Sequence, residues 1–368
     1  MKKCIAVLLV ICLLLSGCSS MFGGSYVSIN PHLEEDQLDR QEFLQVRSYE
    51  GLLSALAAQI EVGAETVTLS VSGFSEEWIT NSMDAAIRNI TANHPLGVYA
   101  VESITYEQGT TGGVSAVAVT ITYNSNRAEL LRLKRAKGME QAQSIVTAAL
   151  DQCEAGVVFL VEGYEQTDFI QMIENHADAH PESVMELPAV TVSMFPQSGD
   201  DRLVELRFEY QTSRDTLRGM QTTVAPVFAS ARLYVSGDAP AEEKYSQLCS
   251  FLIERYQYQI ETSKTPTYSL LRYGVGDSKA FAVVYASMCR QAGLECQVVS
   301  GTWAGESRFW NIICVDEVHY HLDLLRCNET GVFQTLSDSQ MKGYVWDYSA
   351  YPVCGMPEPD PTEETTQE

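Results

Sequence analysis

Residues 292–301 read Ala-Gly-Leu-Glu-Cys-Gln-Val-Val-Ser-Gly. Gly293 is a typical helix stop, and the apolar, β-branched residues after it predict a strand over 294–301. Immediately before it, residues 268–282 predict a loop that leads into a helix, with Asp277 or Ser278 as the N-cap. This part of the chain is therefore predicted to be a helix that ends at Gly293 and is followed directly by a strand.

The neighbouring segments extend this pattern in both directions. Residues 243–259 have the apolar spacing of an amphipathic helix. Residues 309–315 and 319–325 predict two strands around a tight turn at Asp316 and Glu317. The result is an α+β domain over residues 236–356.

Four stretches of this domain come in the order and spacing of a known family. They are Gly276-Asp277-Ser278, residues 292–301, Arg308-Phe309-Trp310-Asn311 and Tyr320-His321-Leu322-Asp323. On these residues the region from about 242 to 325 resembles the transglutaminase-like domain, a papain-like thiol-enzyme fold. The resemblance places the family's nucleophile at Ser278, its base at Arg308 and its orienting acid at Asp323.

Two of these three positions depart from the family, which has a cysteine nucleophile and a histidine base. A thiol at a helix N-terminus beside an imidazole ionises near neutral pH, whereas a serine hydroxyl needs a base to remove its proton. The Arg308 guanidinium is permanently protonated and has no acceptor atom. We therefore expect Arg308 to pair with Asp323, and no catalytic residue in this domain: a pseudoenzyme whose groove binds a ligand.

Three alternatives remain open. His319 and His321 lie on the same strand face as Asp323, so one of them could serve Ser278 as base in a peptidase or acyl transferase. A neighbouring thiol, Cys289 or Cys314, could replace the nucleophile, although both lie in apolar stretches that raise a thiol pKa. A solute-binding lipoprotein is the third, disfavoured because the preceding domains do not have the pattern of two large βαβ lobes.

The domain is rich in aromatic residues, most of which are expected in the core or in a packed strap over residues 344–351. Trp303 lies in the expected loop over 301–307, beside the groove, and is the first candidate for a binding contact. Trp310 and His321 are further candidates.

Ahead of this domain lies an internal duplication. Its matches keep their order at an offset of 86 to 90 residues, and each Tyr…Arg match is followed by a leucine. They are Val71-Ser72-Gly73-Phe74 with Val161-Glu162-Gly163-Tyr164, His94-Pro95 with His180-Pro181, and Tyr123…Arg127 with Tyr210…Arg214. We expect the His-Pro and Tyr…Arg pairs to be turns and packing residues rather than ligand contacts.

Both copies have the same predicted elements. A first helix (52–60, then 142–152) precedes a short strand, a second helix that begins after Ser75 in the first copy, two more strands and a closing basic helix. Each copy is therefore predicted to be a small sheet with helices on it.

The N-terminus has the features of a bacterial export signal. Lys2 and Lys3 precede an apolar run over residues 5–15, which is too short for a spanning helix. The run ends in Leu15-Ser16-Gly17-Cys18, which resembles the lipobox of bacterial lipoproteins. This resemblance implies cleavage before Cys18, a lipid on its thiol and a position on the extracytoplasmic face of a bacterial membrane.

The net charge and the cysteine spacing exclude some classes of binding partner and cofactor. The formal net charge is −24, or about −26 once Lys2 and Lys3 are removed, which argues against nucleic acid and against direct binding of anionic lipid. The expected partners are the membrane, through the Cys18 lipid, and an envelope peptide, a cell-wall polymer or a protein.

Seven cysteines follow Cys18 without a CxxC pair, so no metal site and no cofactor is expected. If a disulfide exists, Cys327 with Cys354 is the first pairing to test.

The predicted fold class is α+β: two duplicated α+β repeats followed by a transglutaminase-like domain. The predicted order is a signal peptide (1–17), a lipidated tether (18–46), repeat 1 (47–138), repeat 2 (139–225), the transglutaminase-like domain (236–356) and a disordered acidic tail (357–368).

Overall fold

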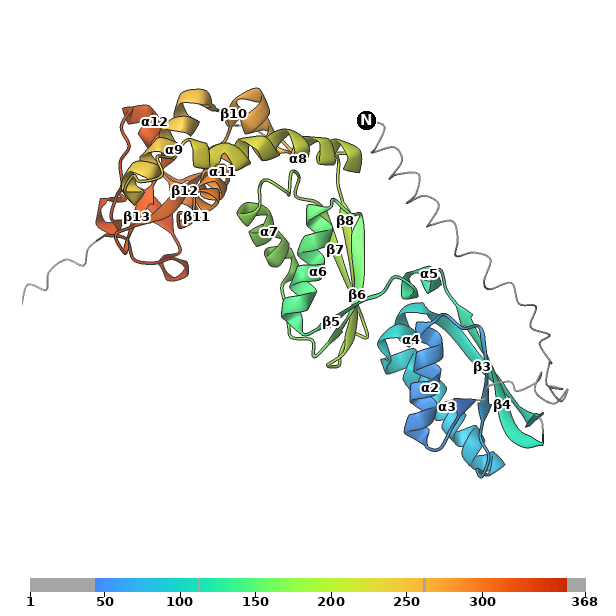
Figure 1. Ribbon diagram of the computed structural model, residues 1–368. Coiled ribbons are helices and arrows are strands. Elements are labelled where there is room, and N and C mark those ends of the chain that lie inside the picture. Colours follow the sequence, from blue (N-terminus) through green and yellow to red (C-terminus); the bar gives the residue numbers. More distant parts are fainter. Residues whose placement is uncertain (1–43, 112, 261–262, 356–368) are drawn as a thin grey trace, which may run out of the picture. The chain divides into compact units, whose positions relative to one another are not determined.

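A computed structural model describes residues 44–111, 113–260 and 263–355 (Figure 1). The expected signal peptide, the Cys18 lipobox, most of the tether and the acidic tail lie outside these residues. Within them, no helix combines the length and the apolar character that crossing a bilayer needs. The described chain is α+β, with three four-stranded sheets and one two-stranded sheet.

The first repeat is a four-stranded sheet in the order β1-β2-β4-β3, with helices on it. Its strands are β1 (Leu44–Gln45), β2 (Thr66–Ser70), β3 (Val101–Thr111) and β4 (Val114–Tyr123), and its helices are α2 (Tyr49–Glu61), α3 (Glu76–Asn93), α4 (Pro95–Ala100) and α5 (Arg127–Leu130). Ser75 caps α3 as expected, because its hydroxyl accepts a hydrogen bond from the Trp78 amide.

The second repeat has the same strand order, β5-β6-β8-β7, without a counterpart of α4. Its elements are β5 (Lys134–Lys137), α6 (Met139–Asp151), β6 (Gly156–Glu162), α7 (Phe169–Ala179), β7 (Ala189–Phe195), β8 (Arg202–Glu209) and α8 (Arg214–Ala229). Equal strand orders in two successive units are what a duplication produces.

The repeated arginines explain one of the sequence matches. Arg127 donates through Nε to the Gly63 carbonyl just beyond α2, and its guanidinium pairs with Glu65. Arg214 donates through Nε to the Gln152 carbonyl at the end of α6 and pairs with Glu154. In both copies an arginine therefore satisfies a carbonyl at the end of the first helix, where the helix dipole is negative.

Two features of the repeats differ from the expectation. The closing helix of the first copy, α5, has only four residues, because the chain turns at once into β5, whereas α8 of the second copy has sixteen. The edge strands β1 and β5 were not recognised, and they lie on the N-terminal side of residues 47 and 139, where the repeats were expected to begin.

The C-terminal region is built around α11 (Ser278–Gln291) and a sheet in the order β13-β12-β11-β14. The sheet strands are β11 (Cys296–Trp303), β12 (Glu306–Val315), β13 (Val318–Leu322) and β14 (Tyr344–Trp346). The remaining α-helices and strands are α9 (Ala241–Arg255), β9 (Gln257–Tyr258), α10 (Pro266–Tyr268), β10 (Val275–Gly276) and α12 (Leu324–Thr330), and short 3-10 or π turns lie at Ser269–Tyr273, Asp338–Gln340 and Tyr348–Ala350. Asp316 and Glu317, both at positive φ, form the two-residue turn between β12 and β13.

Three boundaries in this region differ from the prediction. The helix expected to reach residue 259 ends at Arg255, since Gln257 and Tyr258 pair with β10. The strand expected to reach residue 325 ends at Leu322, since Asp323 caps α12. The loop around Trp303 is only a turn at Ala304 and Gly305, since Trp303 pairs with Glu306.

The sheet has two different faces. One packs with Ile313 and Leu322 into the core around α9, α11 and α8. The other forms a smaller core covered by β14 and by the segments before and after it (the strap), made of Val299, Trp310, Ile312, Leu336, Met341, Tyr344, Trp346 and Cys354. A polar residue on the second face is therefore either under the strap or at an open end of the sheet.

The seven cysteines of the described residues are all free thiols. The Cys327–Cys354 disulfide considered from the sequence is absent. Cys327 instead hydrogen-bonds the buried thiol of Cys249 on α9.

Candidate functional site

Ser278 is the first residue of α11, and Asp277 is the N-cap whose carboxylate accepts from the Ala280 amide. The Ser278 side chain is almost buried, and its Oγ accepts a hydrogen bond of 3.2 Å from the backbone amide of Phe309 on β12. The start of the helix is therefore held against the strand position next to Arg308. This is how the fold brings the first two family positions together.

The expected contact between Arg308 and Asp323 is present and buried. Arg308 Nε donates to Asp323 Oδ2 at 2.9 Å, and Nη2 donates to Oδ1 at 3.0 Å. This two-point geometry uses the guanidinium as a rigid fork, which a histidine cannot do.

Asp323 has three further donors. The Tyr344 hydroxyl donates to Oδ2 at 2.7 Å, and the backbone amides of Leu325 and Arg326 donate to Oδ1. Burial, followed by the Asp323 charge, holds the pKa of Tyr344 well above its ordinary value. The carboxylate thus has its hydrogen-bonding capacity filled by side chains and a helix start, with Tyr344 a partner that the sequence did not indicate.

The two histidines of β13 contact other groups. His319 Nε2 lies 3.6 Å from a carboxylate oxygen of Glu295. His321 accepts at Nδ1 from Trp310 Nε1 at 3.0 Å and donates from Nε2 to Asp338 at 2.8 Å. Across the described residues, the hydrogen bond found at Ser278 Oγ comes from a backbone amide and not from an imidazole. The arrangement that a relocated serine triad needs is not formed.

Two of the three candidate binding residues are core residues. Trp310 and His321 have relative exposures of 0%, because β14 and the strap cover that face of the sheet. Neither offers surface to a ligand in this structure. Trp303 is 41% exposed, and its ring lies over the Arg308 guanidinium at 5.6 Å. It is the candidate that the structure leaves accessible.

The two thiols considered as substitutes are poor nucleophiles. Burial raises the pKa of the Cys289 thiol well above its ordinary value, and its residue has no exposed surface. Burial, followed by the Glu295 charge, raises the pKa of the Cys314 thiol. Both are therefore thiols rather than thiolates at neutral pH.

A cleft of about 690 Å³ opens beside the start of α11. Its walls carry charged and amide groups together with two aromatic rings, those of Lys279, Arg290, Asp178, Gln297, Phe309 and Tyr351. Lys279 and Phe309 are the residues that follow Ser278 and Arg308 in the chain. The cleft is thus adjacent to the family positions without containing them.

Comparison with known proteins supports the domain assignment. Residues 229–349 match the model of the transglutaminase-like superfamily. No curated protein matches the chain.

Three solved structures resemble parts of the chain. A proposed protease from Parabacteroides distasonis ATCC 8503 is 10% identical with a TM-score of 0.23, over 60% of this chain and 36% of its own, so this chain spans about a third of that protein. A proposed cysteine protease from Cytophaga hutchinsonii is 7% identical with a TM-score of 0.25, over 43% and 70%. A TGase is 10% identical with a TM-score of 0.25, over 59% and 63%.

The assignment rests on the family match, on the helix that begins at Ser278 and on the strands that carry Arg308 and lead to Asp323. The C-terminal part of this α+β chain is a transglutaminase-like superfamily domain.

Proposed function

We propose that this protein is a lipid-anchored envelope protein whose transglutaminase-like domain binds a partner without converting it. The partner is an envelope peptide, a cell-wall polymer or another protein. The observation that carries the proposal is the buried fork between Arg308 and Asp323, with a backbone amide as the hydrogen-bond partner of Ser278.

The chemical reason is the absence of a proton acceptor at the nucleophile position. A serine attacks a carbonyl only when a base takes its proton in the same step. Arg308 stands where that base belongs, and its two donating nitrogens already face the Asp323 carboxylate. The Asp323 carboxylate is occupied by its own donors, so it is not free to receive a proton from Ser278.

The surface around Ser278 favours binding. Trp303 presents an exposed ring backed by a guanidinium, and the cleft beside α11 has a polar and aromatic lining. Aromatic faces combined with a few fixed polar groups are typical of peptide and carbohydrate contacts.

The proposal is tested with a serine-reactive fluorophosphonate probe on the whole chain, read by mass spectrometry of the labelled peptide. We expect no adduct on Ser278. Ser287→Ala, at a buried serine of the same helix, is the matched control for Ser278→Ala. Labelling that disappears in Ser278→Ala and persists in Ser287→Ala would establish a serine peptidase or acyl transferase instead.

A second variant tests whether restoring the family's cysteine and histidine at positions 278 and 308 is enough to activate the nucleophile. In Ser278→Cys/Arg308→His, a thiol at a helix N-terminus stands with an imidazole next to Asp323. We expect iodoacetamide to react with Cys at position 278 about tenfold faster at pH 7 than in Ser278→Cys alone, since an adjacent imidazolium lowers a thiol pKa. Equal rates would mean that position 308 does not face the nucleophile.

The anchor is proposed from the lipobox that ends at Cys18. Cys18→Ala removes the only thiol that the motif can lipidate, so the protein is expected in the soluble fraction after cell disruption. Retention in the membrane fraction would contradict the anchor and leave the binding proposal untouched.

A further inference from the structure

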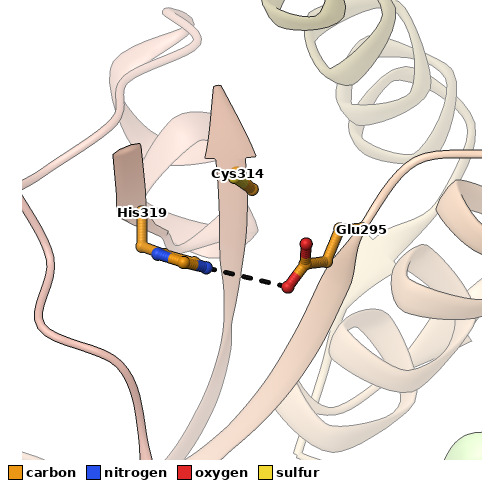
Figure 2. A group of neighbouring side chains, drawn as sticks. All are labelled: Glu295, Cys314 and His319. Atoms are coloured by element: carbon orange, nitrogen blue, oxygen red, sulfur yellow. Dashed lines mark ion pairs between the residues drawn. The ribbon is translucent and has the colours of Figure 1, made fainter. Parts of the chain in front are cut away.

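Glu295, Cys314 and His319 lie next to one another at one end of the C-terminal sheet (Figure 2). Cys314 on β12 is the direct cross-strand partner of His319 on β13. Cys296 pairs with Ile313, so Glu295, one residue earlier, lies beside Cys314 on the other side. Three adjacent backbone segments thus each supply one side chain to a single row.

The β12–β13 turn fixes the distance between two members of the row. In a hairpin closed by two residues, the first pair, here Val315 and Val318, exchanges the backbone hydrogen bonds. The next pair, Cys314 and His319, is then of the closely spaced kind, with side chains on the same face. The Gly355 amide donates to the outward-facing His319 carbonyl, which agrees with this register.

The third member is tied to the same backbone. The Tyr245 hydroxyl donates to the Glu295 carbonyl and is also hydrogen-bonded by the backbone of Cys314. Tyr245 itself is buried in the core below α11. The backbones that carry the carboxylate and the thiol are therefore held together by one core side chain.

The row is accessible and surrounded by negative charge. Glu295 is exposed, and Cys314 and His319 are half-buried, His319 with 28% of its side chain exposed. Asp316 and Glu317 of the turn add two carboxylates close to Cys314. This potential favours a cation and opposes an anion.

The donor set and spacing fit one class of cation. The thiol sulfur, the imidazole nitrogen and the carboxylate oxygen all lie within 4.8 Å of one another, and the nitrogen and oxygen are 3.6 Å apart. Two ligands at about 2.0–2.1 Å from a tetrahedral zinc ion are about 3.4 Å apart. Sulfur with imidazole excludes Mg²⁺ and Ca²⁺, which take oxygen ligands.

We propose that Glu295, Cys314 and His319 form a binding site for a divalent zinc-class metal ion, with a fourth position open to water or to a group from a partner. Binding displaces the thiol proton to solvent, and the thiolate, imidazole and carboxylate each donate one electron pair to the ion. The proposal does not depend on whether the domain is catalytic.

A second group in the same domain provides the matched control. His321, Asp338 and Cys354 also lie within 4.8 Å of one another. Both nitrogens of His321 are engaged, by Trp310 and Asp338, and Asp338 also accepts from the Cys354 amide. A metal bound to His321 would have to break one of the hydrogen bonds of this buried ring, so this group is expected to stay metal-free.

The test uses the whole chain in detergent, stripped of metal and kept reduced by a phosphine. Zn²⁺ is titrated in competition with a chromophoric chelator, and Co²⁺ is added separately to look for the sulfur-to-cobalt charge-transfer band. We expect one zinc per chain and a cobalt band. Cys314→Ser and His319→Gln should each weaken zinc binding about tenfold or more, and Cys314→Ser should abolish the band.

Cys354→Ser and Asp338→Asn are the controls and should retain both signals. Circular dichroism checks that every variant is folded. The proposal is overturned if the reduced chain does not compete with the chelator for zinc, or if Cys354→Ser weakens binding as much as Cys314→Ser does. It is also overturned if zinc binds while the triple variant Glu295→Gln/Cys314→Ser/His319→Gln binds equally well.

Discussion

Arg308 and Cys314 lie on the same face of one strand, β12, about 20 Å apart at ~3.3 Å per residue. Around Arg308 every strong acceptor is filled: Asp323 receives two bonds from the guanidinium, one from Tyr344 and two from backbone amides. Around Cys314, the neighbouring groups of His319 and Glu295 are 3.6 Å apart, and all three side chains are at least partly exposed. The comparison teaches that the acceptors around Arg308 are all occupied, whereas the side chains around Cys314, at the other end of the same strand, remain at least partly exposed.

The largest change in unfolding free energy is expected at the Arg308–Asp323 pair. Arg308→Ala leaves the Asp323 carboxylate buried without its ion-pair partner, and breaking a buried pair by removing one member costs about 3–5 kcal/mol of unfolding free energy. Urea denaturation of the whole chain measures it. Arg214→Ala, at an ion pair whose side chains are 52% and 38% exposed, is the control and should cost less than about 1 kcal/mol. Equal costs would mean that the buried Arg308–Asp323 pair stabilises the fold no more than a partly exposed ion pair does.

A smaller effect separates the two histidines of β13. Burial, partly offset by Asp338, lowers the pKa of His321 in the folded protein, and Trp310 donates to the nitrogen that a second proton would need. The unfolded chain therefore takes up the proton first, below about pH 6.5, so the stability from His321 is present above that pH and is lost as pH falls toward the folded-state pKa.

Unfolding free energies between pH 7 and pH 5.5 should decline by up to about 1.4 kcal/mol per pH unit at the steepest point for one such group. His321→Gln should flatten this decline. His94 is a second buried imidazole with a lowered pKa, so His94→Gln should remove its own share and leave that of His321. If the unfolding free energy of His321→Gln falls with pH as steeply as that of the wild type, the burial of His321 under the strap does not disfavour its protonation.

The smallest effect is expected at the open end. In metal-free protein, Cys314→Ser and His319→Gln should each change the unfolding free energy by less than about 0.5 kcal/mol, because partly exposed groups without a buried partner contribute little. Adding Zn²⁺ at about 100 times its dissociation constant should stabilise the wild type by about 2.7 kcal/mol and the two variants by much less. Thermal melts with and without zinc measure both quantities. A large loss in the metal-free variants would make the row structural.

The sequence predicted the elements well where a face is buried. The alternation in β4 and β8, the caps at Ser75 and Asp277 and the turn at Asp316 are signals carried by residues close together in the chain, so short sequence windows are enough to predict them. The Arg308–Asp323 pair was predictable as well, since both partners occupy motif positions of one family.

The predictions that failed depend on which segments cover each face of the C-terminal sheet. Trp310 and His321 are candidate binding residues in the sequence, but β14 and the strap bury them, and nothing in β12 or β13, the strands that carry them, indicates this. Tyr344, the first residue of β14, donates its hydroxyl hydrogen to Asp323. The row of Glu295, Cys314 and His319 has no sequence spacing typical of a metal site, because its members meet only through strand register. A histidine directly across a hairpin from a cysteine is the signal that would have found it.

The strand β5 has a practical consequence for dissecting the molecule. It precedes α6 and pairs in parallel with β6, so it closes one side of the second sheet. A fragment that starts at residue 139 lacks it and leaves the amide and carbonyl groups of β6 bare, next to the apolar side chains of Phe159 and Val161. Such an unprotected edge recruits further strands from other molecules, so this fragment would aggregate, whereas one that begins at Lys134 carries its own protection.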